Sequence, residues 1–108
     1  MARLADISIE QVSDSIESGC RLIDVRETDE YLSGHVPGAE SWPLSALADS
    51  FDRLGTQSSL IVICRSGGRS AQACDFLAER GFDVSNVEGG TMAWAMSGRD
   101  LVEGASPR

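Results

Sequence analysis

One segment restricts the possible folds of this chain more than any other. Residues 60–63 are apolar and mostly β-branched, the run ends abruptly at Cys64, and two adjacent glycines follow. A helix-like sequence resumes at Ser70 and closes at Gly81. This order is typical of a strand buried on both faces, followed by a tight loop and a helix. The segment therefore predicts an α/β fold with a parallel sheet, and it places the Cys64 thiol at the carboxyl end of a buried strand.

The position of Cys64 predicts a reactive thiol. In open α/β sheets, ligands bind beyond the carboxyl ends of the strands, where the free N–H groups of the next helix are electropositive. Gly67 and Gly68 allow the loop to curl its N–H groups around an anion, and Arg65 and Arg69 add positive charge. Cysteine pKa values in such settings fall to roughly 3.5–7.5, so we expect a thiolate at neutral pH. A small core residue before an ordinary turn is the alternative.

The thiol and both arginines belong to one loop, Cys64-Arg65-Ser66-Gly67-Gly68-Arg69-Ser70. This loop resembles the active-site loop of rhodanese-family sulfurtransferases, in the form usual for their single-domain members. Phosphatases that share the fold have a similar loop that is one residue longer, whereas four residues separate Cys64 from Arg69 here. A shorter loop forms a smaller ring of N–H donors, which suits the outer sulfur of a cysteine persulfide better than a phosphoryl group. The resemblance implies that Cys64 is catalytic and that residues 65–70 bind the substrate.

Further segments extend the resemblance over about residues 4–102. The sequences Asp24-Val25-Arg26 and Gly34-His35-Val36-Pro37-Gly38-Ala39 resemble a rhodanese signature that is mainly structural, and Gly89-Gly90 resembles the carboxyl-terminal signature. The resemblance implies the rhodanese fold, a three-layer α/β sandwich with about five mainly parallel strands and helices on both faces. With 108 residues, the chain should form a single domain, and residues 103–108 should be a flexible tail.

Apolar periodicity and glycine positions predict alternating elements along the chain. A short extended piece begins at Asp6, and a helix with a Ser8 to Gln11 capping box then runs to Gly19. The remaining predicted strands are residues 20–26, 40–42, 60–63 and 82–87. The remaining predicted helices are residues 27–33, 44–54, 70–80 and a final one that carries Trp94 as a core anchor.

Asp24 and Arg26 are candidate supporting residues of the site. They lie on the opposite face of their strand from its apolar residues and near its carboxyl end, close to the expected position of Cys64. They are placed to brace the loop through charge-assisted hydrogen bonds. A surface ion pair with Glu30 is an equally good interpretation.

The single histidine and the two other cysteines have structural interpretations. His35 lies in a loop between a glycine and a Val-Pro step, so we expect it to hold a turn by hydrogen bonding rather than to carry protons. Cys74 belongs to the helix stripe that should face the sheet, which favours packing over redox chemistry. Cys20 resolves an oxidised Cys64 only if the fold brings the two within disulfide range.

Composition excludes several classes of function. The formal net charge of −8 and the sequence pI near 4.4 argue against nucleic-acid binding and against anionic membranes. All nine basic residues are arginine, which excludes lysine Schiff-base chemistry. No Cys-x-x-Cys pair is present, and we predict neither a disulfide framework, a metal nor another cofactor. The start lacks a signal-peptide pattern and a working thiolate suits a reducing compartment, so we expect a cytoplasmic protein.

The resemblance implies ping-pong sulfur transfer through a Cys64 persulfide. The expected partners are a small anionic donor such as thiosulfate and an acceptor that is cyanide, a thiol or a thioredoxin-like protein, with the protein itself a monomer or a weak dimer. Two alternatives stay open. One is a sulfur-relay or regulatory module loaded by a protein partner, and the other is an arsenate reductase or phosphatase that uses the same thiolate.

Overall fold

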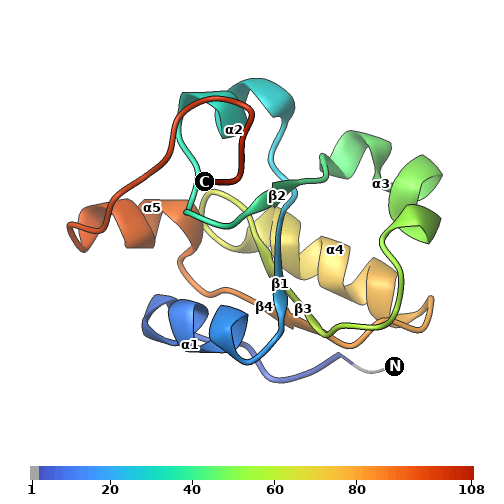
Figure 1. The fold of residues 1–108 in the computed structure, drawn as a ribbon. Coiled ribbons are helices and arrows are strands. Elements are labelled where there is room, and N and C mark those ends of the chain that lie inside the picture. Colours follow the sequence, from blue (N-terminus) through green and yellow to red (C-terminus); the bar gives the residue numbers. More distant parts are fainter. Residues whose placement is uncertain (1–2) are drawn as a thin grey trace.

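A parallel sheet forms the centre of the molecule, as seen in a computed structural model that describes residues 3–108 (Figure 1). Within these residues the sheet has four strands in the order β2-β1-β3-β4. They are β1 (Arg21–Asp24), β2 (Glu40–Ser41), β3 (Leu60–Ile63) and β4 (Val84–Asn86). Because β3 is an inner strand and is buried at every position, Cys64 leaves the sheet close to its middle.

Helices cover both faces of the sheet and complete three layers, so the predicted rhodanese-like α/β sandwich is confirmed (Figure 1). They are η1 (Ile9–Gln11), α1 (Val12–Glu17), α2 (Thr28–Ser33), α3 (Leu44–Ser50), η2 (Phe51–Arg53), α4 (Gly68–Ala78) and α5 (Gly90–Met96). Helices α3 and α4 pack on one face, whereas α1, α2 and α5 contribute to the core on the other. Helices α1, α2 and α5 are short, and each contributes one large side chain to this core, namely Val12, Tyr31 and Trp94.

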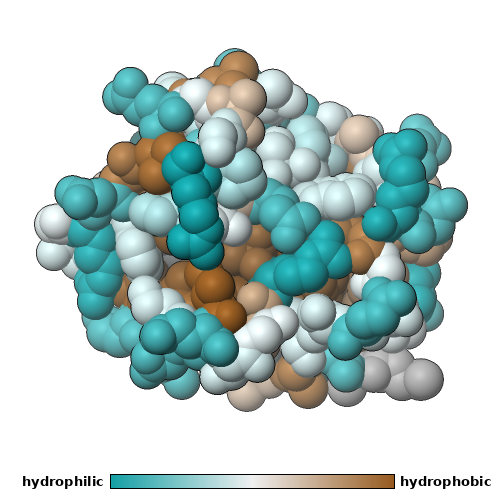
Figure 2. Space-filling view, viewed as in Figure 1, coloured by the Kyte–Doolittle hydropathy of each residue, from teal (hydrophilic) through white to brown (hydrophobic). Residues whose placement is uncertain are grey.

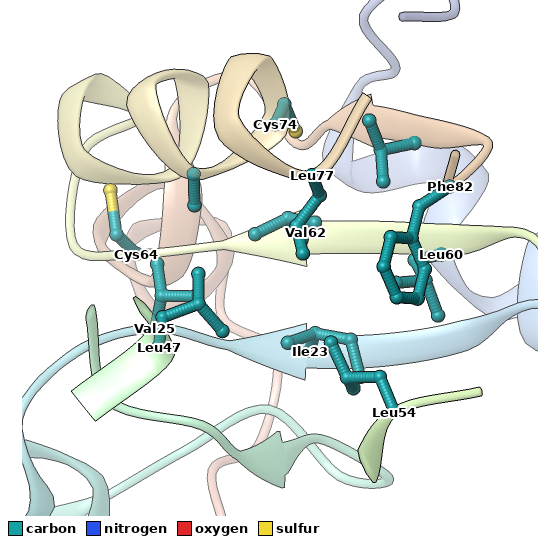
Figure 3. Packing of buried hydrophobic residues seen from close by; sticks show 12 residues of the cluster. Ile23, Val25, Leu47, Leu54, Leu60, Val62, Cys64, Cys74, Leu77 and Phe82 are labelled. Atoms are coloured by element: carbon teal, nitrogen blue, oxygen red, sulfur yellow. The ribbon is translucent and has the colours of Figure 1, made fainter. Parts of the chain in front are cut away.

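The alternation of side chains along the strands produces two separate cores. On one face Ile23 and Val62 pack against Leu47 of α3 and Leu77 of α4, and Cys64 lies at the edge of this cluster (Figure 3). On the opposite face the neighbouring strand residues Leu22, Ile61 and Ile63 pack with side chains from the other helices, among them Val12, Tyr31 and Trp94. Trp94 is therefore a core anchor, as expected from the sequence.

The sheet has one strand fewer than the roughly five that the sequence predicts. The amino-terminal extended piece makes only isolated bridges to the edge of the sheet, Arg3 with Val84 and Ile7 with Val87. Its side chains are largely exposed, with Leu4 at 42 %. Only Ile7 of this piece packs against the core, so little packing is available to extend the two bridges into a continuous ladder.

The carboxyl-terminal residues, for which the sequence predicts a flexible tail at 103–108, lie against the end of α2 and the loop that follows it. The Gly104 N–H donates to the Leu32 carbonyl at 2.9 Å, and the Gly38 N–H donates to the Pro107 carbonyl at 2.8 Å. Because these contacts join backbone groups, no side-chain pattern in the sequence announces them.

His35 holds this region together. The ring is fully buried, stacks on Tyr31 at 3.7 Å between centroids, and lies 2.9 Å from the Tyr31 carbonyl through Nδ1 and 2.8 Å from the Ser106 carbonyl through Nε2. The expectation that His35 holds a turn is confirmed, and the same ring also fastens the end of the chain.

The surface is mainly polar. Figure 2 shows one face on which hydrophilic residues predominate and hydrophobic ones fill the hollows between them. The large hydrophobic side chains that are exposed are Leu4, Leu32, Met92, Met96 and Leu101. No helix within residues 3–108 combines the length and apolar character that a membrane crossing requires.

Candidate functional site

The Cys64 sulfur lies where β3 passes into the loop that leads to α4. Figure 3 shows the sulfur pointing toward the amino-terminal end of α4. The Gly67 N–H donates to Sγ at 3.1 Å, and the Ser70 hydroxyl lies 3.2 Å from the same atom. Gly67 has a φ of 111°, a left-handed conformation that glycine adopts without strain, and it forms the N-cap of α4. The loop therefore curls around the sulfur, as the sequence predicts.

Hydrogen bonding makes this thiol more acidic despite its burial. Cys64 is only 1 % exposed, and this burial on its own raises the pKa of the thiol. Hydrogen bonds from the Ser70 hydroxyl and from the backbone N–H groups of Ser70, Gly67 and Ser66 lower the pKa by more. The net pKa lies below the ordinary cysteine value, so the arrangement favours a thiolate.

Helix α5 holds the loop in this orientation. The Thr91 N–H donates to the Cys64 carbonyl at 2.9 Å, and the Met92 N–H donates to the Arg65 carbonyl at 2.9 Å. In a trans peptide the C=O and N–H groups point in opposite directions, so these bonds turn the N–H groups of Arg65 and Ser66 away from α5. Gly90 permits the close approach, since a Cβ there would lie 2.5 Å from the Cys64 carbonyl oxygen.

The two loop arginines have different surroundings. Arg69 forms a bidentate ion pair with Glu30 of α2, with N to O distances of 2.7 and 2.9 Å. Hydrogen bonding from Arg69 lowers the pKa of Glu30 to about 2, even though desolvation opposes the shift. Arg65 is exposed and, together with Glu30, Met92 and Leu101, lines a cavity of about 340 Å³ beside the loop. Arg65, rather than Arg69, therefore presents its charge to an open cavity.

Asp24 and Arg26 pair with each other instead of bracing the loop. Arg26 Nη2 donates to Asp24 Oδ2 at 2.8 Å and to the Gly34 carbonyl at 2.8 Å, and the two side chains are 7 % and 0 % exposed. The expected direct brace is thus replaced by a buried ion pair that ties β1 to the end of α2. The alternative partner, Glu30, is bound to Arg69 instead.

Residues 8–97 match the family model of the Rhodanese-like domain. The chain belongs to the rhodanese-like family.

Two curated relatives and one solved structure cover most of this rhodanese-like chain. "Putative sulfurtransferase YtwF" of Bacillus subtilis is 38 % identical over 93 residues, which are 84 % of this chain and 90 % of that protein. "Thiosulfate sulfurtransferase GlpE" of Pseudoalteromonas translucida is 31 % identical over 99 residues, 90 % of this chain and 94 % of that protein. The crystal structure of a rhodanese-related protein from Thermoplasma volcanium superposes with a TM-score of 0.85 at 30 % identity, covering 92 % and 98 % of the two chains.

The sequence analysis of this rhodanese-like domain missed one residue that contacts both Ser70 and Gly67, the two residues that donate to the sulfur. Asn86, at the end of β4, accepts a 2.5 Å hydrogen bond from the Ser70 hydroxyl and donates through Nδ2 to the Gly67 carbonyl at 3.3 Å. β4 runs parallel to β3 with Val62 opposite Asn86. The carboxyl ends of parallel strands meet at one edge of a sheet, so a polar residue at the end of the last predicted strand was the available signal.

The other cysteines of the rhodanese-like domain are placed away from this chemistry. Cys74 is buried in the core, and burial raises its pKa to about 12. Cys20 precedes Arg21, which pairs with Leu60 in the parallel register, so Cys20 is level with Ser59. At about 3.3 Å per residue, Cys64 lies roughly 16 Å further along the strand direction, beyond the reach of a disulfide. Among residues 3–108, no three His, Cys, Asp or Glu side chains are grouped to bind a metal ion.

Proposed function

We propose that this rhodanese-like protein is a sulfurtransferase that carries a sulfane sulfur as a Cys64 persulfide. The donor is a small anion such as thiosulfate, and the acceptor is cyanide or a thiol. The observation that carries the proposal is the Cys64 sulfur itself, contacted by the Gly67 N–H at 3.1 Å and the Ser70 hydroxyl at 3.2 Å, with its pKa lowered by hydrogen bonds. The names of the relatives, including a thiosulfate sulfurtransferase, support the same reaction class.

The reaction has two displacement steps. The lowered pKa of Cys64 favours the thiolate that acts as the nucleophile in the first step. In the first, the Cys64 thiolate attacks the outer sulfur of thiosulfate, the S–S bond of the donor breaks, and sulfite leaves with the electron pair. In the second, the acceptor attacks the outer sulfur of the persulfide, and Cys64 leaves as a thiolate. With cyanide the product is thiocyanate. The N–H groups of the loop stabilise the negative charge on sulfur in both steps.

Loading of the sulfur requires a small opening of the loop. Cys64 is 1 % exposed, whereas the side chains of Arg65 and Ser66 that follow it are exposed. An outward movement of residues 65–67 therefore gives a donor access to Sγ. Arg65 borders the open cavity, so its positive charge attracts the anionic donor. Arg69 is paired with Glu30, and this ion pair holds the first turn of α4 in place.

The setting of the reaction follows from the same features. A thiolate that must remain reduced suits a cytoplasmic protein, and we expect a thioredoxin-like protein among the physiological thiol acceptors. The net charge of −8 disfavours nucleic acid as a partner.

The decisive experiment is a thiosulfate:cyanide sulfurtransferase assay that measures thiocyanate, with Cys64→Ser as the control. We expect activity in the wild type and none in the variant, and a wild type no faster than Cys64→Ser overturns the proposal.

A second experiment measures the intact mass of the protein after incubation with thiosulfate and so locates the sulfur. A gain of one sulfur atom that disappears in Cys64→Ser supports direct use of the donor, whereas its absence indicates a module loaded by a protein partner. Hydrolysis of an aryl phosphate that depends on Cys64 would instead indicate a phosphatase.

A further inference from the structure

The Ser70 hydroxyl is shared among three acceptors. Its oxygen lies 3.2 Å from Cys64 Sγ, 2.5 Å from Asn86 Oδ1 and 3.2 Å from the Gly67 carbonyl. A serine hydroxyl carries a single proton, so it donates fully to only one of these acceptors at a time. Ser70 and Asn86 are buried, at 0 % and 5 % exposure, so water does not supply a replacement donor freely.

The orientation of the Asn86 amide is fixed by its second contact. Its Nδ2 donates to the Gly67 carbonyl at 3.3 Å, and a carbonyl only accepts hydrogen bonds. The other end of the amide, Oδ1, is therefore the end that faces Ser70. In this orientation Asn86 competes directly with the Cys64 sulfur for the Ser70 proton.

We propose that Asn86 is a positioning residue that holds the Ser70 proton while Cys64 Sγ is uncharged and releases it to Sγ whenever that sulfur is a thiolate. The part of this proposal that concerns the persulfide rests on the proposed function. Once the persulfide forms, the negative charge moves to the outer sulfur, and the Ser70 O–H turns to Asn86. When the acceptor removes the outer sulfur, the electron pair of the S–S bond returns to Sγ, and the O–H turns back. The proton stays on Ser70 throughout, and no oxidant or base is consumed.

In the second half-reaction this arrangement stabilises charge on Sγ as that charge develops, which is the condition for lowering a barrier. In the first half-reaction the same hydrogen bond stabilises the resting thiolate. It also sets a balance between the two half-reactions. A thiol of lower pKa is a better leaving group but a weaker nucleophile. By competing for the proton, Asn86 keeps the Cys64 thiolate more nucleophilic than Ser70 alone would leave it.

The test is a double-mutant cycle read by the pH dependence of Cys64 alkylation with iodoacetamide, with the labelled peptide identified by mass. The four proteins are the wild type, Ser70→Ala, Asn86→Ala and the double variant. Asn86→Ala should lower the thiol pKa by roughly half to one unit, because the net worth of one hydrogen bond is redirected to the thiolate. In the Ser70→Ala background the same substitution should leave the pKa unchanged. No shift, or an equal shift in both backgrounds, overturns the proposal.

A second variant guards against simple loosening of the loop. Asn86→Asp is similar in size but only accepts hydrogen bonds when ionised, so it should capture the Ser70 proton and raise the thiol pKa, less so in the Ser70→Ala background. Shifts of the same sign in Asn86→Ala and Asn86→Asp would indicate a merely structural role. Alkylation needs no sulfur donor, so this result is independent of the proposed function.

A kinetic test uses thiosulfate and cyanide in single-turnover experiments. Asn86→Ala should load sulfur more slowly and release it faster than the wild type. A change of both rates in the same direction contradicts the inference.

Discussion

Arg69 of α4 and Glu30 of α2 join these two helices through two parallel hydrogen bonds of 2.7 and 2.9 Å. A planar guanidinium that meets a carboxylate in this way gains geometric specificity as well as energy. The loop of residues 64–67 is thus held by α5, and the first turn of α4 that follows it is held by α2. The conformation of the loop around the sulfur therefore depends on tertiary contacts as much as on the sequence of the loop.

The Glu30–Arg69 pair should make stability depend on pH in a defined window. Since the pKa of Glu30 falls from 4.5 to about 2 on folding, its contribution is complete above pH 4.5 and disappears as the pH falls toward 2. The pair is about one-third exposed, so Glu30→Gln should cost at most about 1 kcal/mol at neutral pH. Urea unfolding at a series of pH values measures the difference, and Glu10→Gln at an exposed position serves as the control. A difference between wild type and Glu30→Gln that is the same at pH 7 and pH 2 would contradict this assignment.

The close contact at Gly90 should make that position intolerant of any side chain. Gly90 has a φ of 60°, and an added Cβ would lie 2.5 and 2.6 Å from the carbonyl oxygens of Cys64 and Arg65. Because backbone atoms cannot rotate away, we expect Gly90→Ala to cost more than about 2 kcal/mol. Gly98→Ala is the matched control, since Gly98 also has a positive φ but no atom within 4 Å of the added Cβ. Its cost should be about 1 kcal/mol, from backbone strain alone.

These two glycine variants also differ in what they do to the thiol. Gly90→Ala should slow the alkylation of Cys64 at neutral pH by displacing the loop, whereas Gly98→Ala should leave it unchanged. Equal stability losses and equal alkylation rates in the two variants would show that α5 does not hold the loop.

The buried pair of Asp24 and Arg26 should be costly to break and cheaper to replace. Asp24→Asn leaves the Arg26 guanidinium buried without its counter-charge, and such changes typically cost about 3–5 kcal/mol. Replacing both partners by apolar residues, as in Asp24→Leu with Arg26→Met, should cost less than the single change. Chemical denaturation of the three proteins provides the measurement. A double variant less stable than Asp24→Asn would be inconsistent with a desolvated ion pair.

Arg65 should contribute to binding of the proposed anionic donor. Arg65→Ala removes the charge beside the open cavity and should raise KM for thiosulfate several-fold while changing kcat little. Arg53→Ala, a change of the same kind in η2, should leave KM unaffected. Steady-state kinetics at low and high ionic strength tests the electrostatic origin, because salt should reduce the difference between Arg65→Ala and wild type. An unchanged KM in Arg65→Ala would place the donor's entry elsewhere.

Much of the fold and the centre of the site can be predicted from local sequence. The apolar run before Cys64 and the glycines after it determine a strand, a loop and a helix, and the structure has all three. The roles of Asp24 and Arg26 were predicted less well, because two charged residues on one strand face can brace a neighbour or pair with each other. The hydrogen bonds of Arg26 to Asp24 and to the Gly34 carbonyl show that these two residues pair with each other.

Asn86 and Glu30 illustrate what local sequence does not contain. Each contacts the loop from an element far away in the chain, and their contacts depend on strand order and helix placement rather than on a nearby pattern. The parallel register of β4 beside β3 brings Asn86 next to Ser70. The residues at the ends of the strands can be read from the sequence, but which of them are neighbours can be predicted only once the order of the strands is known.

The near-complete burial of Cys64 has a consequence for chemical selectivity. A sulfur recessed beneath the protein surface is reached end-on, by an atom at the tip of a slender molecule, and bulky reagents meet the rim first. In the proposed reaction, this position shields the Cys64 persulfide from large thiols and oxidants. On that proposal, molecular size as well as charge selects the molecules that exchange sulfur with Cys64.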